Sequence, residues 1–246
     1  MKNSQITRIC LWSGPRNIST ALMYAFAQRS DTRVYDEPLY AHYLSQTDAR
    51  DYHPGGEDVI DSMEKDGNKV VRDLILGSDA APVLFFKHMS HHLVQLDWSF
   101  MSETVNVILT RDPVEMLPSY AKQVNQPTIR DVGYAQHVVL LDYLQSLGQN
   151  PPVLDARETL LNPRRVLAKL CERIDIPFEE SMLSWPPGPR PEDGIWAEYW
   201  YDSVHRSTGF QPYAPKTTPF PQELRPLLSQ CQPYFEQLTK LAITSK

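Results

Sequence analysis

The sequence has few cysteines and no long apolar stretch. Cys10, Cys171 and Cys231 are odd in number, widely spaced and never arranged as Cys-x-x-Cys. This argues against a disulfide framework or a cysteine-based zinc site and favours free thiols in a reducing compartment. No apolar run approaches the roughly 20 residues of a membrane span, and Met1–Gln5 leads into a run too short for a signal peptide. We therefore expect a cytoplasmic protein that has no membrane partner.

Positive charge is also scarce. The 24 lysines and arginines are outnumbered by 30 aspartates and glutamates, which gives a net charge of −6. This excess argues against a nucleic-acid partner, although a few basic groups can still converge on a nucleotide in one cleft. The length of 246 residues and the 41% hydrophobic content suffice for a sizeable core. We predict a single domain over residues 1–246 and leave a homodimer open.

Short apolar runs alternate with helical patterns along the first two thirds of the chain. The runs predict strands at 6–12, 32–36, 83–86, 105–110 and 153–155, and the patterns predict helices at 19–28, 114–122, 129–147 and 159–174. This alternation predicts an α/β fold, a three-layer sandwich in which a central, mostly parallel sheet of about five strands is flanked by helices. The Pro- and aromatic-rich segment from about 185 to 221 is expected to form ordered loops that cover the active site.

The connection between the first strand and the first helix concentrates groups that bind phosphate. It reads Ser13-Gly14-Pro15-Arg16-Asn17-Ile18-Ser19-Thr20. A tight turn here would aim backbone N–H groups, a helix N-terminus and the Arg16 charge at one point, which suits an anion. The loop is not a Walker A motif, because Ser19 stands where the lysine would be and Ile18 where its glycine would be. ATP chemistry is therefore poorly supported, and a plain strand-to-helix turn is the alternative.

This loop resembles the 5′-phosphosulfate-binding loop of sulfotransferases that use PAPS (3′-phosphoadenosine-5′-phosphosulfate). Arg16 matches the basic position of that family, and Ser19 and Thr20 match its hydroxyl pair. Ile18 departs from the family, which commonly has glycine there, and isoleucine adopts φ > 0 only at a cost. The resemblance implies a P-loop-NTPase-like fold, PAPS as donor, 3′,5′-adenosine bisphosphate as product and no metal. It also implies that residues 13–20 bind the donor.

A second basic motif follows the fourth predicted strand. Arg111 ends the strand, Asp112-Pro113 opens a helix, and Ser119 stands eight positions after Arg111. An arginine at the carboxyl end of a strand can fork onto a phosphate. The alternative is that Arg111 pairs with Asp112 or caps the sheet edge. The spacing resembles the family's site for the 3′-phosphate of PAPS.

A third likeness, by position alone, lies in the loop 204–210. The family closes its nucleotide site with a basic, glycine-containing loop near the C-terminus, although its usual Arg-Lys-Gly triplet is absent here. The likeness implies nucleotide contacts from His205, Ser207, Thr208 and Gly209. A solvated loop is the alternative.

Sulfuryl transfer needs a base for the acceptor proton and groups that neutralise the departing phosphate. Arg16 is placed for the second task. Glu37 follows the second predicted strand and is the first candidate for the base, as in some members of the sulfotransferase superfamily. Pro38 predicts an extended backbone at Glu37. A surface carboxylate, or an ion pair with Arg16, is the alternative.

The segment 87–92 is the second source of catalytic groups. Cytosolic sulfotransferases carry Lys-Thr-His here, so the resemblance implies that Lys87 touches the donor, while the family's histidine falls on Met89. An imidazole base could come from His88, His91 or His92. We expect that His91 and His92 do not both point inward, and no spacing supports a metal site. A glutamate base would lose activity at lower pH than a histidine, whose usual pKa is about 6.5.

The leading hypothesis is a sulfotransferase that moves a sulfuryl group from PAPS to a hydroxyl or amine of a small acceptor. The alternatives are a nucleotide-dependent kinase or NTPase of P-loop type, and a non-catalytic nucleotide-binding protein. The sequence leaves open the acceptor and the choice between Glu37 and a histidine of 88–92 as the base.

Overall fold

The computed structural model describes residues 6–246 and is built around a sheet of five parallel strands. The strands are β1 (Thr7–Ser13), β2 (Thr32–Asp36), β3 (Val83–Met89), β4 (Val105–Thr110) and β5 (Val153–Asp155). Their order is β2-β3-β1-β4-β5. The chain winds to one side of β1 for β2 and β3 and to the other side for β4 and β5. Such a reversal opens a crevice at the carboxyl ends of the strands.

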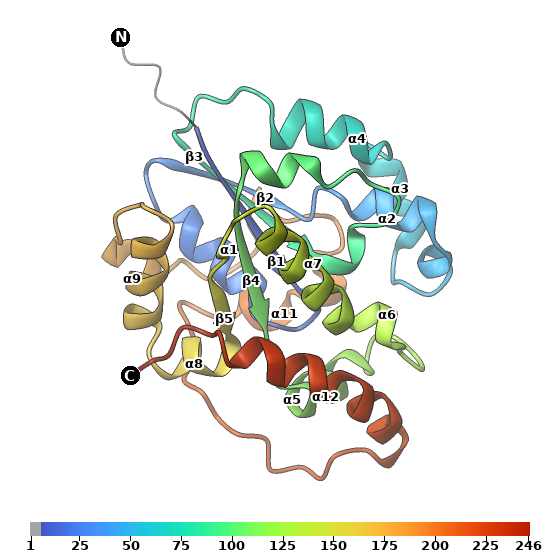
Figure 1. The fold of residues 1–246 in the computed structure, drawn as a ribbon. Coiled ribbons are helices and arrows are strands. Elements are labelled where there is room, and N and C mark those ends of the chain that lie inside the picture. Colours follow the sequence, from blue (N-terminus) through green and yellow to red (C-terminus); the bar gives the residue numbers. More distant parts are fainter. Residues whose placement is uncertain (1–5) are drawn as a thin grey trace.

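Helices cover both faces of this sheet (Figure 1). The α-helices are α1 (Ser19–Ala27), α2 (Tyr40–Gln46), α3 (Gly56–Ser62), α4 (Gly67–Val70), α5 (Pro113–Tyr120), α6 (Ile129–Val132), α7 (Tyr134–Ser146), α8 (Ala156–Leu161), α9 (Pro163–Arg173), α10 (Ala197–Trp200), α11 (Asp202–His205) and α12 (Arg225–Thr239). Short 3₁₀ or π segments are η1 (Asp48–Asp51), η2 (Val71–Ile75), η3 (Ser90–His92), η4 (Ser99–Glu103), η5 (Glu180–Leu183) and η6 (Gln222–Leu224).

Alternate residues of β1 build two hydrophobic cores. Ile9 and Leu11 pack in the core that includes residues of α1 and α9, whereas Cys10 and Trp12 pack in the core that includes residues of α7 and α12. Because helices cover both faces, β1 can be apolar along its whole length. The predicted three-layer α/β sandwich is confirmed.

The predicted elements agree with the structure except at particular boundaries. All five strands are present, but β3 continues three residues further than predicted, through Lys87 to Met89. The predicted helix 129–147 is divided into α6 and α7 at Gly133, whose φ is +73°. The predicted helix 159–174 is likewise two helices, because Asn162 caps a new one that starts at Pro163. Helices α2–α4 and α10–α12 lie outside the predicted patterns.

Three expectations concerned features that the sequence lacks, namely paired cysteines, a membrane span and a metal-binding pattern. Cys10, Cys171 and Cys231 are buried free thiols. No helix within residues 6–246 combines the length and the apolar character needed to cross a bilayer. The same residues contain no group of three or more His, Cys, Asp or Glu side chains arranged to hold a metal ion. Met1–Gln5, on which the signal-peptide argument rests, lie outside the described residues.

Candidate active site

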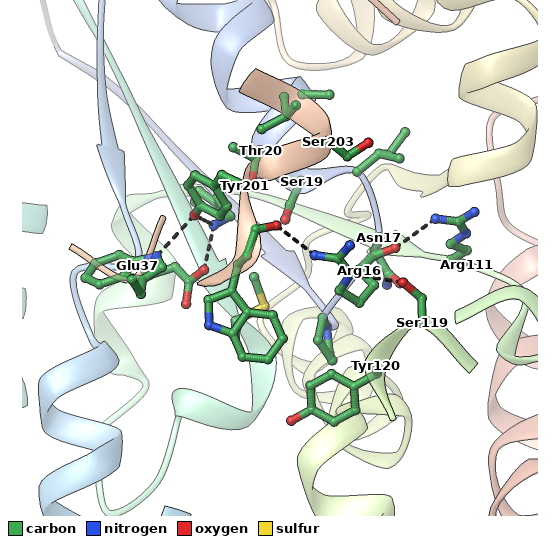
Figure 2. A pocket seen from close by; sticks show the side chains of 18 of the residues that line it. Arg16, Asn17, Ser19, Thr20, Glu37, Arg111, Ser119, Tyr120, Tyr201 and Ser203 are labelled. Atoms are coloured by element: carbon green, nitrogen blue, oxygen red, sulfur yellow. Dashed lines mark hydrogen bonds and ion pairs between the residues drawn. The ribbon is translucent and has the colours of Figure 1, made fainter. Parts of the chain in front are cut away.

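A pocket of about 330 Å³ lies at the carboxyl ends of the strands. Its walls come from the loop after β1, the turn after β2, the end of β3, helix α5 and the late segment 196–211. Figure 2 shows Arg16, Arg111 and Ser119 on one side of this pocket and Glu37 on the other. The sequence-predicted residues that line it are Pro15, Arg16, Asn17, Ile18, Ser19, Thr20, Glu37, Lys87, His91, His92, Arg111, Ser119, Ser207 and Gly209.

Four predicted nucleotide-binding residues do not line the pocket that residues 6–246 form: Ser13, Gly14, His205 and Thr208. Ser13 is buried at the end of β1, and its hydroxyl donates to the Gly14 carbonyl at 2.7 Å. A Cβ on Gly14 would come within 2.8 Å of a carbonyl of α6, so close packing decides this position. The Nε2 atom of His205 lies 3.0 Å from the Asp193 carboxylate, and Thr208 is exposed. His205 and Thr208 were selected by position alone, and neither is among the residues that line the pocket.

The loop 14–18 has a backbone conformation that L-residues rarely adopt. Arg16 and Ile18 have φ values of +58° and +63°, in the left-handed region. Ile18 precedes α1 directly, so an isoleucine holds the conformation that glycine would adopt without strain. Within the described residues, no side chain caps α1, and its first turn contains no acidic residue. The first N–H groups of α1 therefore stay available for an anion.

Arg16 and Arg111 meet at the phosphate end of the pocket, which we define by the loop 15–20 together with Arg111 and Ser119. Nη1 of Arg111 donates to the Arg16 carbonyl at 2.9 Å, and the same guanidinium pairs with Glu115 at 3.1 Å. Arg16 donates from Nε to the Ser119 hydroxyl at 3.1 Å and from Nη1 to the Trp200 carbonyl at 2.8 Å. Burial, and then the charge of Arg111, lower the pKa of Arg16. Two crowded arginines beside a hydroxyl form a set that suits a phosphate.

Helix α5 holds this second basic motif in the predicted way. Arg111 follows β4, and Asp112 caps α5 by accepting a hydrogen bond from the Val114 N–H at 2.8 Å. Asp112 therefore serves the helix, and the carboxylate that pairs with Arg111 is Glu115, one turn further on.

A buried ion cluster forms the opposite end of the pocket. The ammonium group of Lys87 donates to Asp36 Oδ1 at 2.8 Å, to Glu37 Oε1 at 2.5 Å and to the Tyr201 hydroxyl. The exposed fractions of the Lys87, Asp36 and Glu37 side chains are 1%, 1% and 9%. Burial raises the pKa of Glu37, although Lys87 opposes the shift. Burial favours a lower pKa for Lys87, but the two carboxylates outweigh it and raise that pKa.

The backbone of Glu37 differs from the prediction. Pro38 favours an extended Glu37, yet its φ is +43°. The Glu37 N–H donates to the Lys87 carbonyl at 2.8 Å, and the Glu37 carbonyl accepts from the Tyr40 N–H at 2.9 Å. The prediction was wrong because these bonds to the sheet and to the following turn outweigh the local preference before proline. The ion partner of Glu37 is also Lys87 and not Arg16.

The three histidines after Lys87 occupy different environments. His88 lies within β3 and stacks on Trp12 at 4.4 Å. His91 and His92 both line the pocket, contrary to expectation, because a 3₁₀ turn sets their rings at 83° to one another. Burial lowers the pKa of His88 and of His91 to about 3. Both rings are therefore neutral at physiological pH.

Several pocket residues were not identified from sequence. They include Tyr40, His53, Tyr120, Trp196, Trp200 and Tyr201. The hydroxyl of Tyr201 donates to the Asp36 carboxylate at 2.8 Å and accepts from Trp196 Nε1 at 3.2 Å. The aromatic content of the segment 185–221 was the available signal for Trp196, Trp200 and Tyr201. His53 lies in a turn that has no recognisable motif.

The sequence of the chain matches a known protein family and two plant proteins. The family model of the sulfotransferase domain matches residues 7–242, and the chain belongs to the sulfotransferase family. Branched-chain-amino-acid aminotransferase-like proteins 1 and 2 of Arabidopsis thaliana are 43% and 41% identical to it over 230 and 228 residues, 92% of this chain. The chain spans about 40% of the length of these relatives.

A solved structure shares the fold. It is the sulfotransferase domain from the curacin biosynthetic pathway, which superposes with a TM-score of 0.54 at 16% sequence identity. The match covers 92% of this chain and 98% of that chain. At this identity the likeness concerns the fold.

Proposed function

We propose that the chain transfers a sulfuryl group from PAPS to a hydroxyl or amine of a small acceptor. The observation that carries the proposal is a pocket with an anion-binding end and a carboxylate end. Arg16, Arg111 and the uncapped N-terminus of α1 stand at the first end, and Glu37 stands at the second. Membership of the sulfotransferase family supports this class of transfer.

The donor lies along the phosphate end. Its 5′-phosphosulfate rests on the loop 15–20, where the N–H groups of α1 and the Arg16 guanidinium meet it. Its 3′-phosphate binds Arg111 and the hydroxyl of Ser119. That hydroxyl accepts a hydrogen bond from Arg16 in the structure. When PAPS binds, its phosphates take the place of this bond and contact both side chains. Binding an anion here also relieves the repulsion between the two arginines.

The chemistry is a displacement at sulfur. Glu37 accepts the proton of the acceptor while the acceptor oxygen or nitrogen attacks the sulfur atom. The bond from sulfur to the 5′-phosphate oxygen breaks, and the electron pair leaves with 3′,5′-adenosine bisphosphate. Arg16 and the N–H groups of α1 neutralise the charge that develops on this leaving group. Burial raises the pKa of Glu37, and the charge of Lys87 opposes that shift and so favours the charged, proton-accepting form.

The same proposal includes the organisation of the chain. The late segment 196–211 supplies one wall of the pocket, which fits one domain over 1–246 whose aromatic-rich part covers the active site. The buried thiols fit a reducing, cytoplasmic compartment.

The test combines binding and transfer. We expect 3′,5′-adenosine bisphosphate to raise the melting temperature more than ATP with Mg²⁺ does, because a ligand that binds only the folded state stabilises it. We also expect sulfur label from PAPS to appear in a pool of small hydroxyl and amine compounds. A preference for ATP would point to a kinase or NTPase. Tight bisphosphate binding without transfer to any pool would point to a non-catalytic nucleotide-binding protein.

A further inference from the structure

Two neighbouring carboxylates, Asp36 and Glu37, share the ammonium group of Lys87 but differ in position. Asp36 ends β2 and is not among the residues that line the pocket, whereas Glu37 lines it. The side chain of Asp36 is 1% exposed and that of Glu37 is 9% exposed. Glu37 can therefore meet a substrate, whereas any effect of Asp36 on the reaction passes through another residue.

The carboxylate of Asp36 is the more fully bonded of the two. It accepts hydrogen bonds from Lys87 Nζ at 2.8 Å, from the Tyr201 hydroxyl at 2.8 Å and from the Gly194 N–H at 3.1 Å. The carboxylate of Glu37 accepts from Lys87 alone among the described residues, through Oε1. A carboxylate has two oxygens that can accept. The second oxygen of Glu37 is therefore left for a proton, while Asp36 holds its neighbours in place.

The ammonium group of Lys87 has no N–H to spare. It carries three donors, and one goes to Asp36, one to Glu37 and one to the Tyr201 hydroxyl. That hydroxyl is also fully used, because it donates to Asp36 and accepts a second hydrogen bond from Trp196 Nε1 at 3.2 Å. The position of Lys87 beside Glu37 is therefore set by Asp36 and Tyr201.

The ionisable side chains that face Glu37 come from four elements. They are Asp36 at the end of β2, Lys87 on β3, Tyr40 at the start of α2 and Tyr201 after α10. Burial raises the pKa of each tyrosine well above its usual value, so both stay neutral. Burial also raises the pKa of Glu37, the charge of Lys87 lowers it, and the charge of Asp36 raises it. The carboxylate that holds Lys87 in place therefore also makes Glu37 a stronger base.

We propose that Asp36 is a positioning residue for sulfuryl transfer, which holds Lys87 beside Glu37 and whose negative charge strengthens Glu37 as a base. A general base is most effective when its proton affinity suits the working pH. At neutral pH a carboxylate gains from a neighbour that raises its affinity for the proton. This inference rests on the proposed function, in which Glu37 takes the proton of the acceptor.

Asp36→Asn tests the role of the charge, because asparagine keeps the size of the side chain. Proton uptake by Glu37 is followed by NMR of isotopically labelled glutamate carboxyl carbons, and the Glu37 signal is the one that Glu37→Gln lacks. We expect Glu37 to titrate at a lower pH in Asp36→Asn than in the unaltered chain. We also expect kcat to fall about tenfold, measured with the compound of the hydroxyl and amine pool that accepts most label. An unchanged titration or an unchanged kcat would overturn the inference.

Asp131→Asn is the matched control for a loss of stability. Asp131 is likewise buried, and it accepts from the Tyr52 hydroxyl and from the Thr128 N–H, each at 2.7 Å, but it does not line the pocket. The variant should lower the melting temperature and leave the titration of Glu37 where it was. Equal shifts of that titration in Asp131→Asn and Asp36→Asn would show that the effect is not specific to the shared ammonium group, and would overturn the inference.

Tyr201→Phe tests the contact between Asp36 and Lys87 while keeping every charge, and it decides the question if Asp36→Asn does not fold. Loss of the hydroxyl should displace Lys87 and lower kcat about tenfold with little change in the KM of the same acceptor. Tyr24→Phe is the control, because the Tyr24 hydroxyl donates to the Asp193 carboxylate at 2.8 Å but does not line the pocket. Equal kcat values in the two variants, or a change in KM alone, would overturn the inference.

Failure of the inference differs from failure of the proposed function. A chain that neither binds 3′,5′-adenosine bisphosphate nor transfers label from PAPS would overturn the function itself. Transfer that proceeds with the same kcat and the same Glu37 titration in Asp36→Asn would overturn only the role of Asp36.

Discussion

The Nζ atom of Lys87 lies 2.5 Å from Oε1 of Glu37, in a pair that is buried at the carboxylate end of the pocket. Asp36 is a second carboxylate on the same ammonium group, at 2.8 Å. One buried positive charge therefore compensates two buried negative charges, and the proposed base depends on that charge for its ionisation. The stability of the sheet edge and the chemistry of the pocket are linked through this one side chain.

Lys87→Met should destabilise the protein strongly. Methionine keeps the length of the side chain but removes the charge, and an uncompensated buried carboxylate costs about 3–5 kcal/mol. The loss in unfolding free energy, measured with urea, should shrink as the pH falls and Glu37, whose pKa burial raises, becomes protonated. Lys69→Met is the control, because Lys69 forms an ion pair of the same length, 2.5 Å, at the surface with Glu64. Similar small losses in both variants would contradict the expectation.

Glu37→Gln should remove the base and preserve the shape of the pocket. Turnover should fall by about 10²–10⁴-fold, the usual contribution of a positioned general base. The affinity for 3′,5′-adenosine bisphosphate should stay the same, because Glu37 lies at the end of the pocket opposite Arg111 (Figure 2). His91→Phe is the reciprocal variant and should act on the KM of the acceptor more than on kcat. A fully active Glu37→Gln enzyme would move the role of base to the segment 87–92.

The pH profile should distinguish a glutamate base from a histidine base. In this pocket the glutamate should lose activity at a higher pH than the histidine, which is the reverse of what their usual pKa values would give. Burial raises the pKa of Glu37 above its usual value of about 4.3, whereas burial lowers the pKa of His91 to about 3. A base acts when deprotonated, so activity is lost as the pH falls through its pKa. We expect kcat/KM to decline in acid at a pH above 4.3, the usual glutamate value. The decline should persist in His91→Phe, and a decline centred near pH 3 would instead indicate the histidine.

Arg111→Ala should weaken the recognition of the 3′-phosphate. A hydrogen bond to a charged group contributes about 1.5–3 kcal/mol, so affinity for 3′,5′-adenosine bisphosphate should fall about 10–100-fold while affinity for AMP changes little. Calorimetric titration with both nucleotides measures the difference. Arg130→Ala, at an exposed arginine paired with Asp48, is the control and should change neither affinity. Equal affinities of the unaltered chain for AMP and the bisphosphate would refute the assignment of Arg111 and Ser119.

Arg16→Ala should lower the rate of transfer as well as the affinity for the donor. Charge grows on the 5′-phosphate in the transition state, so the loss of a group that neutralises it should reduce kcat by about 10²–10³-fold. Steady-state kinetics with PAPS separates the two effects. An increase in KM with unchanged kcat would make Arg16 a binding residue alone.

The strands and the positions directly after them could be predicted because both follow from local pattern. Arg16, Glu37 and Arg111 each come shortly after an apolar run, and the carboxyl ends of parallel strands share one edge of the sheet. Reliance on local pattern also explains why the end of β3 was predicted three residues too early. Lys87 marks the end of an apolar run in the sequence, and only its partners Asp36 and Tyr201, 51 and 114 residues away, allow its charge to stay inside.

The aromatic and histidine residues around the carboxylate end of the pocket could not be predicted, because they come from loops that carry no spacing rule. His53 comes from the turn before α3, and Trp200 comes from the end of α10. His205 shows the converse error, since its place in a late basic loop suggested a nucleotide contact, whereas its ring bonds to Asp193. The left-handed backbone of Glu37 likewise depends on its hydrogen bond to β3. A preference read from the Glu37-Pro38 dipeptide alone cannot include that bond.

Three non-glycine residues around the pocket, Arg16, Ile18 and Glu37, hold left-handed backbones. A position of this kind can usually be relaxed by one substitution to glycine or asparagine. Selection for heat resistance and selection for turnover would therefore act in opposite directions on these three codons. A variant library screened for melting temperature alone should accumulate glycine or asparagine there, and its most heat-resistant members should be poor catalysts.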